Sequence, residues 1–283
     1  HEVSGVVESL GIGAKGLSVG QKVTIQPQVV CGKCHPCRHG KYNLCEDLKV
    51  MGFQTTGTAS HFFAVDAAKV TPLPDAMTFD EGAMIEPLAV AVHSVRQAGD
   101  VSGLDIIVLG AGPIGNLVAQ TAKGLGAKRV MITDVSDFRL SKATECGIDV
   151  CVNTTKEDLG EAINRTFGPD RADLIYDCAG NDATMGQAIK YARKGSIVVL
   201  VAVFAKMANI DLAVLNDHEL DLKTSMMYRN DDYLEAIRLV GEHKVKLAPL
   251  VSKHFPFRQY VDAYRFIDGD REHALKVIIE VQE

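Results

Sequence analysis

The chain has 283 residues, of which 47% are hydrophobic and 23% are charged, and its formal net charge is −6. This length is enough to bury a sizeable core and is typical of two domains. The mild negative charge argues against a basic footprint for nucleic acid, and the longest apolar runs are strand-sized rather than membrane-spanning. We therefore expect neither nucleic acid nor a membrane as a partner.

Residues 1–92 are predicted to be rich in β-strands. Short apolar runs at Val3–Val7, Lys22–Ile25 and Ser60–Val65 are separated by Gly, Asp and Pro. The sequence starts at His1 and enters a strand pattern at once. We therefore expect a fragment, or a numbering that begins inside a domain.

Four cysteines are crowded into one short loop: Cys31, Cys34, Cys37 and Cys45. Four thiolates suit a tetrahedral zinc ion, and the C-x2-C spacing lets a short loop wrap the metal. Unrelated buried thiols are the plain alternative, and a bacterial ferredoxin cluster fits less well because its fourth Cys follows after three residues and precedes Pro. We predict a structural zinc ion here. Seven cysteines, four of them assigned to a metal, favour a cytoplasmic protein over a disulfide framework.

From Val101 onward, predicted strands alternate with predicted helices. The strands are Asp105–Leu109, Arg129–Thr133, Val150–Val152, Ala172–Cys178, Ser196–Val203 and Asp221–Met226; the helices are Pro113–Leu125, Asp137–Cys146, Glu157–Thr166, Ala183–Ala192 and Asp232–Glu242. This alternation is typical of an α/β fold with a doubly wound parallel sheet. The remaining tail is mixed (Val251–Phe257, Tyr260–Ile267, Lys276–Val281) and is expected to fold back onto the first domain.

A glycine-rich loop follows the first of these strands and opens a helix. Gly110 allows a tight turn, Gly112 lets the backbone approach a pyrophosphate, and Gly115 lets the helix pack on the strand. The helix N-terminus then faces the phosphates. A plain strand–helix turn is the alternative, but this context favours a dinucleotide site.

Asp134 ends the next predicted strand. A carboxylate there accepts hydrogen bonds from the ribose hydroxyls and repels a 2′-phosphate, so the sequence favours NAD over NADP. Arg139 could accommodate a phosphate and weakens this prediction slightly. A helix N-cap is the other interpretation of Asp134.

His1, Glu2 and Glu86 are candidates for a second, catalytic metal site. An imidazole with carboxylates suits a zinc ion that keeps one coordination position open for water or substrate. Spacing alone supports this weakly, because Glu86-Pro87 also suits a helix start with Pro at its first position. His93, on a predicted helix, is expected to be structural.

Taken together, the four-Cys loop, Glu86-Pro87-Leu88, Gly110–Gly115 and Asp134 resemble the zinc-dependent medium-chain dehydrogenase/reductase family over essentially the whole chain. Leu109–Gly115, Thr133–Lys142 and Val251–Phe257 are most similar to segments of its sorbitol (L-iditol) dehydrogenase group. The resemblance implies a Rossmann NAD-binding domain at 93–247. It also implies a GroES-like catalytic domain at 1–92 and 248–283, whose N-terminal part is missing.

The resemblance also implies site roles. His1 and Glu2 match a Gly-His-Glu motif that binds the catalytic zinc, and Glu86 lies at that zinc as a ligand or through its water. The family's third ligand is an upstream Cys outside this sequence. Arg229 would meet polyol hydroxyls, and Asn230 stands where animal sorbitol dehydrogenases carry a Tyr that touches substrate. The residues expected to line NAD are Gly110, Gly112, Pro113, Ile114, Gly115, Asp134, Arg139, Val201, Ala202, Val203, Met227, Tyr228 and Arg229.

The expected function is a zinc-dependent oxidoreductase that transfers a hydride from a secondary alcohol of a polyol or sugar acid to NAD. A threonine- or butanediol-type dehydrogenase of the same family is one alternative, and a non-catalytic NAD-binding protein of the same fold is another. The resemblance further implies a homodimer or homotetramer joined edge to edge across Asp221–Met226.

Overall fold

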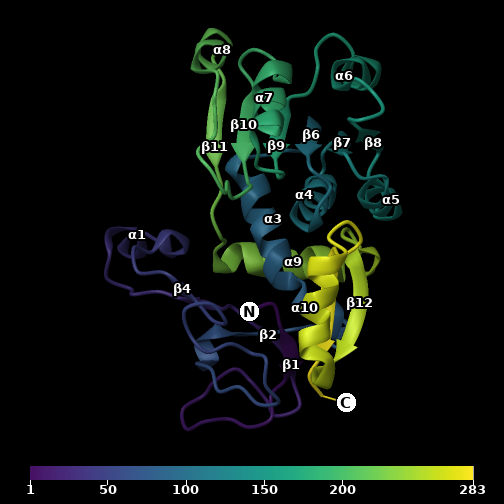
Figure 1. Cartoon of the computed structure of the whole chain (residues 1–283). Coiled ribbons are helices and arrows are strands. Elements are labelled where there is room, and N and C mark those ends of the chain that lie inside the picture. Colours follow the sequence, from purple (N-terminus) through teal and green to yellow (C-terminus); the bar gives the residue numbers. More distant parts are fainter. Residues whose placement is uncertain (283) are drawn as a thin grey trace.

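The computed structural model describes residues 1–282. Its upper half in Figure 1 is a six-stranded parallel sheet with strand order β11-β10-β9-β6-β7-β8. The strands are β6 (Asp105–Leu109), β7 (Arg129–Asp134), β8 (Val150–Asn153), β9 (Leu174–Asp177), β10 (Ile197–Leu200) and β11 (Asp221–Thr224). The order reverses beside β6, so the expected doubly wound sheet is confirmed.

Helices cover both faces of this sheet because both faces of its strands are apolar. In β6, Ile106 and Val108 belong to one buried core and Ile107 and Leu109 to another. Alternate residues of a strand point to opposite faces, so each face needs its own cover. The helices of this half are α4 (Pro113–Gly124), α5 (Asp137–Glu145), α6 (Leu159–Phe167), α7 (Asp182–Tyr191), α8 (Leu212–Asp217) and α9 (Asn230–Gly241).

Helix α3 (Ile85–Gln97) connects the two halves of the molecule. Ten residues between Ile85 and Val95 are buried, polar as well as apolar, and the helix packs against α4 and α9. A helix buried almost all round is a core element rather than a surface one. It begins at Ile85, so Pro87 lies at its third position and not, as expected, at its first.

The lower half in Figure 1 is β-rich. Strands β1 (Ser4–Val6), β2 (Lys22–Ile25) and β5 (Val70–Pro72) form an antiparallel sheet, and β3 (Gln28–Val29) pairs with β4 (Lys49–Val50). The short elements between them are α1 (His35–Arg38) and 3-10 turns at Tyr42–Leu44 and Ala67–Lys69, and α2 (Phe79–Ala83) follows β5.

The C-terminal segment returns to this half. Strands β12 (Val251–Pro256) and β13 (Lys276–Glu280) pair in parallel on either side of α10 (Tyr260–Gly269), after a 3-10 turn at Ala248–Leu250. His254 Nε2 lies 2.8 Å from Asp80 Oδ2, which ties the tail to the β-rich region. Among the described residues, no helix is long and apolar enough to cross a membrane.

One predicted strand is wrong. Ser60–Val65 forms no strand, because the backbone bends at its start and Ser60 Oγ donates locally to the Phe62 carbonyl. Phe62 is 70% exposed, so the apolar run does not pack into a sheet as its pattern suggested.

Candidate active site

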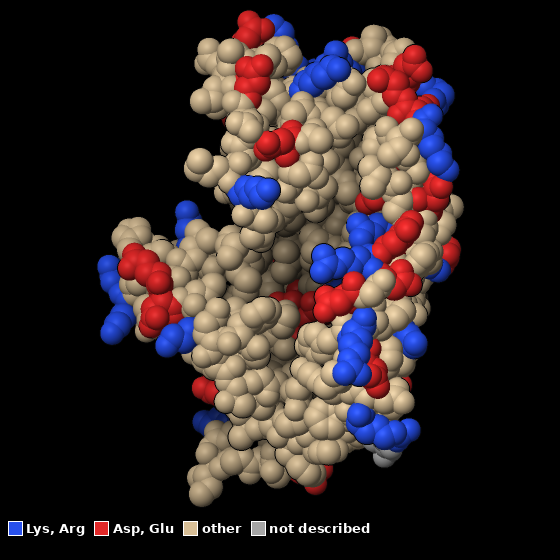
Figure 2. Space-filling view, viewed as in Figure 1, with Lys and Arg blue, Asp and Glu red and all other residues tan. Residues whose placement is uncertain are grey.

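Three side chains that could hold a metal ion meet where the N-terminal residues approach α3. His1, Glu2 and Glu86 each place one ligand atom within 4.8 Å of the others. His1 Nε2 lies 3.9 Å from Glu2 Oε1. Figure 2 shows a hollow between the two halves of the molecule, with carboxylate side chains at its base.

The donor chemistry of this cluster fits a divalent cation. Glu86 is 5% exposed, and its Oε1 accepts a hydrogen bond of 3.0 Å from the Tyr228 hydroxyl. Burial, and then the charge of Glu2, raise the pKa of Glu86 to about 7. Two neighbouring carboxylates in so little solvent are stabilised by a positive charge between them, and an imidazole with two carboxylates suits zinc.

Lys276 supplies part of that positive charge. Its Nζ lies 2.6 Å and 2.5 Å from the two carboxylate oxygens of Glu2, and its side chain is 15% exposed. The contact fixes the orientation of Glu2 from a strand at the other end of the chain. No local pattern in the sequence marks Lys276 for this role.

The four cysteines of the predicted zinc loop also converge. Cys31, Cys34, Cys37 and Cys45 place their sulfurs within 4.8 Å of one another, and all are free thiols. Cys34 Sγ and Cys45 Sγ are 3.9 Å apart. A tetrahedral site with Zn–S bonds of about 2.3 Å has an S–S edge of about 3.8 Å, so the spacing fits zinc.

Backbone amides shape the charge of this loop. The amides of Lys33 and Cys34 lower the pKa of the Cys31 thiol to about 6. Burial, together with the neighbouring thiols, raises the pKa of Cys37 to about 12. The Cys31 thiol is therefore ready to ionise, whereas Cys37 needs the charge of a metal to do so.

The glycine-rich loop has the geometry of a phosphate-binding turn. Gly110 has a φ of 98°, and a Cβ on Gly115 would lie 1.8 Å from the Gly110 carbonyl oxygen. Only glycine fits either position. A Cβ on Gly112 would meet open space, and Pro113 follows as the first residue of α4. The N-terminus of α4 is therefore open to an anion.

Asp134 lies at the C-terminal end of β7, beside this loop. Its Oδ2 accepts from the Ala111 amide at 2.7 Å, and its Oδ1 accepts from the amides of Val135 and Ser136. The N-cap of α5 is Ser136, whose hydroxyl accepts from the Arg139 amide. The interpretation of Asp134 as an N-cap is therefore wrong.

Arg139 faces the C-terminal segment. Its Nη2 donates to the Arg271 carbonyl at 3.0 Å, while its buried Nε has no partner among residues 1–282. Glu272 Oε1 lies 3.0 Å from the Ser136 hydroxyl. The segment that follows α10 thus contacts the edge of the predicted nucleotide site, a contact that no local sequence pattern predicts.

The other predicted cofactor residues fall into two short segments. Val201, Ala202 and Val203 follow β10, and Val203 is 87% exposed; Ile114 lies in the first turn of α4. Met227, Tyr228 and Arg229 connect β11 to α9. Tyr228 is fully buried and its hydroxyl donates to Glu86, so this segment reaches the metal cluster directly.

Arg229 has a partly unsatisfied guanidinium. Its buried Nε has no hydrogen-bond partner among the described residues, and its Nη2 is 3.5 Å from Asp231 Oδ2. A buried donor without a partner is unfavourable unless a ligand satisfies it. The predicted substrate role of Arg229 fits this observation.

Comparisons with known proteins match both halves of the chain. Residues 1–75 match the alcohol dehydrogenase GroES-like domain, and residues 113–242 match the zinc-binding dehydrogenase domain. The 2-dehydro-3-deoxy-L-galactonate 5-dehydrogenase of Pseudoalteromonas atlantica is 33% identical over 99% of this chain and 81% of its own length. Human sorbitol dehydrogenase is 34% identical over 93% of this chain and 74% of its own length.

A solved structure shows the same arrangement. A protein from Escherichia coli described as a short chain alcohol dehydrogenase, complexed with NADH, superposes with a TM-score of 0.91 at 29% identity. The match covers 99% of this chain and 83% of that protein. The sheet and the β-rich region therefore have the same relation in both.

Proposed function

Because the chain belongs to the zinc-binding dehydrogenase family, we propose that it oxidises a secondary alcohol of a polyol or sugar acid and passes the hydride to NAD. The observation that carries the proposal is the convergence of His1, Glu2 and Glu86 in one partly buried cluster. Relatives named for a sugar acid and for sorbitol support the substrate class.

His1, Glu2 and Glu86 would hold the catalytic zinc, and Cys31, Cys34, Cys37 and Cys45 would hold the structural one. A zinc ion with an open position supplies a Lewis acid that lowers the pKa of a bound hydroxyl. Lys276 keeps Glu2 oriented, as groups behind metal ligands commonly do. Glu86 would lie at this zinc as a ligand or through its water.

Arg229 would bind the substrate away from the oxidised carbon. Its planar fork can donate to two vicinal hydroxyls or to a carboxylate, so either a polyol or a sugar acid would suit this position. The orphaned Nε of Arg229 supports this assignment.

The nucleotide would lie along the C-terminal edge of the sheet. The Gly110–Gly115 turn and the N-terminus of α4 would take the pyrophosphate, and Asp134 would accept from the adenosine ribose. NAD supplies the hydride acceptor when bound. Arg139 and residues 201–203 and 227–229 would complete the surface around it.

The same proposal includes the two domains: a Rossmann NAD-binding domain at 93–247 and a GroES-like catalytic domain at 1–92 and 248–283. So does a homodimer or homotetramer joined across β11, which pairs only with β10 in the described chain and leaves a free edge. The free state of all seven cysteines supports a cytoplasmic location.

The test is NADH formation by the purified protein across polyols, sugar acids, threonine and a vicinal diol, with zinc stoichiometry measured in parallel. We expect turnover with a polyol or sugar acid and two zinc ions per chain. Turnover confined to threonine or the diol would reject the substrate class. NAD binding with structural zinc alone and no turnover would reject the enzyme.

A further inference from the structure

The segment Met226–Asn230, which we call the arginine segment, connects β11 to α9 and carries Arg229. Met227 has a φ of 54°, a left-handed conformation that a non-glycine residue adopts at a cost. Such a conformation persists only where surrounding contacts impose it. The segment therefore depends on its neighbours for its shape.

Side chains from the β-rich half bind three of the five residues of the arginine segment. Asn43 Nδ2 donates to the Met226 carbonyl at 3.0 Å, and Gln28 Nε2 donates to the Tyr228 carbonyl at 2.8 Å. The Asn230 amide donates to the Tyr42 hydroxyl at 2.5 Å, and Gln26 Nε2 donates to Asn230 Oδ1 at 2.6 Å. These contacts cross about 200 residues of sequence, so no local signal reveals them.

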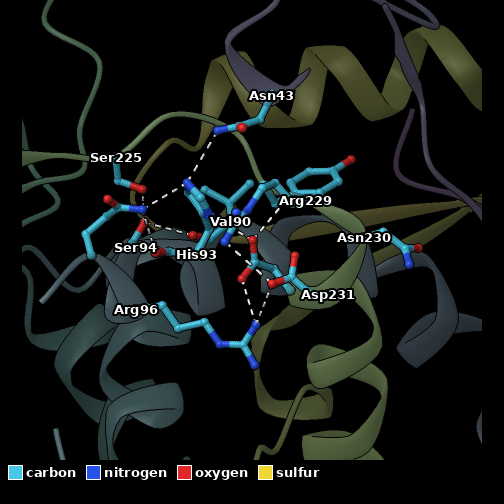
Figure 3. Close-up of polar contacts among 12 residues, drawn as sticks. Asn43, Val90, His93, Ser94, Arg96, Ser225, Arg229, Asn230 and Asp231 are labelled. Carbon is cyan, nitrogen blue, oxygen red and sulfur yellow. Dashed lines mark hydrogen bonds and ion pairs between the residues drawn. The ribbon is translucent and has the colours of Figure 1, made fainter. Parts of the chain in front are cut away.

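A buried ion-pair network holds the other side of the segment (Figure 3). Asp232 is fully buried, and its Oδ2 accepts from the Arg229 amide at 2.9 Å and pairs with His93 Nδ1 at 2.7 Å. Its Oδ1 accepts from Arg96 Nη1 at 2.9 Å. Asp232 therefore links the backbone of Arg229 to two residues of α3, His93 and Arg96.

Asn43 belongs to both sets of contacts. Figure 3 shows Asn43 above His93, and its Nδ2 lies 3.4 Å from His93 Nε2, the ring nitrogen opposite the one that pairs with Asp232. Asn43 and Tyr42 lie between Cys37 and Cys45, inside the four-cysteine loop. The loop thus contacts the arginine segment directly, through two side chains.

We infer that the four-cysteine loop is a positioning element for substrate binding, with Tyr42 and Asn43 holding the arginine segment so that Arg229 meets the substrate. The inference rests on the proposed function and assigns that loop a role beyond local folding. Tyr42 and Asn43 are positioning residues, since they act through the backbone of Met226 and Asn230.

The decisive variant is Tyr42→Phe, which removes one hydroxyl and keeps the ring. Loss of one hydrogen bond should raise KM for the best polyol or sugar acid by roughly two- to tenfold, with kcat changed less. The Asn230 amide should exchange with solvent faster by a similar factor. The zinc content should stay at the wild-type value.

A matched control is Tyr264→Phe. Tyr264 is 53% exposed on α10, and its hydroxyl contacts the Tyr260 hydroxyl. This variant should leave KM and the exchange rate unchanged. Asn43→Ala provides a second test of the same contact set and should raise KM in the same direction.

Unchanged exchange at Asn230 in Tyr42→Phe would overturn the inference, because the loop would not hold the segment. Faster exchange with an unchanged KM would overturn it too, because the contact of the loop with the segment would then have no effect on substrate binding. A wild-type protein that oxidises no member of the substrate panel would instead reject the proposed function. Exchange at Asn230 would then still decide whether the loop pins the segment.

Discussion

Lys276 and Glu2 form a bidentate ion pair across 274 residues of sequence, with Nζ–O distances of 2.6 Å and 2.5 Å. The pair closes the chain onto itself, because β13 carries the lysine and the residues before β1 carry the glutamate. It also fixes the orientation of Glu2, one of the proposed metal ligands. A change at Lys276 should therefore affect metal binding more than folding.

Lys276→Met should weaken zinc binding at the His1–Glu2–Glu86 cluster by about tenfold, which is the usual scale for loss of a group behind a metal ligand. The measurement is competitive chelation followed by zinc analysis. Lys15→Met, at an exposed lysine in a loop, should bind zinc like the wild type. Equal loss of affinity in both variants would show that Lys276 has no specific role.

Glu2→Ala should reduce zinc content from about two ions per chain to about one and lower kcat by more than about a hundredfold, since it removes a ligand of the catalytic site. The four-cysteine zinc should remain. Glu8→Ala, at an exposed glutamate, is the control. Loss of both ions together would mean that the variant has unfolded rather than lost one site.

Asp134→Ser should shift cofactor preference toward NADP by at least about tenfold in the ratio of kcat/KM values, because it removes a charge that repels a 2′-phosphate. Asp134 also accepts three backbone amides, so some loss of stability should accompany the shift. Asp137→Ser, which changes an exposed carboxylate on α5, should keep the NAD preference. A ratio that is the same in both variants would leave Asp134 with a structural role only.

Acid should weaken the Asp232 network. Burial raises the pKa of Asp232, but hydrogen bonds from His93, the Arg229 amide and Arg96 outweigh burial and hold the pKa below its usual range. A depressed folded-state pKa stabilises the protein above the ordinary Asp value of about 3.9, and this contribution is lost as the pH falls below it.

Asp232→Asn should therefore cost about 3 kcal/mol in the free energy of unfolding at pH 7, the scale of a broken buried ion pair, and less at pH 3. Urea titrations of both proteins between pH 3 and pH 7 measure the difference. A cost that does not change with pH would mean that Asp232 acts through packing and not through its charge.

The sheet was predictable because its strands are apolar on both faces. Asp105–Leu109 and Arg129–Thr133 carry that pattern and lie where it placed them, give or take one residue. Ser60–Val65 is also apolar but pairs with no strand. Whether this segment forms a strand therefore depends on a pairing partner and not on its composition. Local patterns cannot reveal whether a partner strand exists.

The candidate site divides in the same way. The four cysteines and the Gly110–Gly115 turn are local motifs, and spacing was enough to find them. The grouping of His1 and Glu2 with Glu86 was predicted from the family resemblance, because 84 residues separate Glu2 from Glu86 and spacing alone supports the group only weakly. Lys276 and Asn43 could not be found at all, because both act through long-range contacts that no local sequence pattern reveals.

Helix α3 carries Glu86 in its first turn and His93 seven residues later, about 10 Å along its axis. Through Glu86 it contributes one member of the proposed metal cluster, and through His93 and Asp232 it holds the backbone of Arg229. A helix of this length does not stretch, so it keeps Glu86 and His93 at a fixed separation. Under the proposed function, the oxidised carbon and the polar group that meets Arg229 would then lie a fixed distance apart, and a shorter alcohol would not reach the guanidinium.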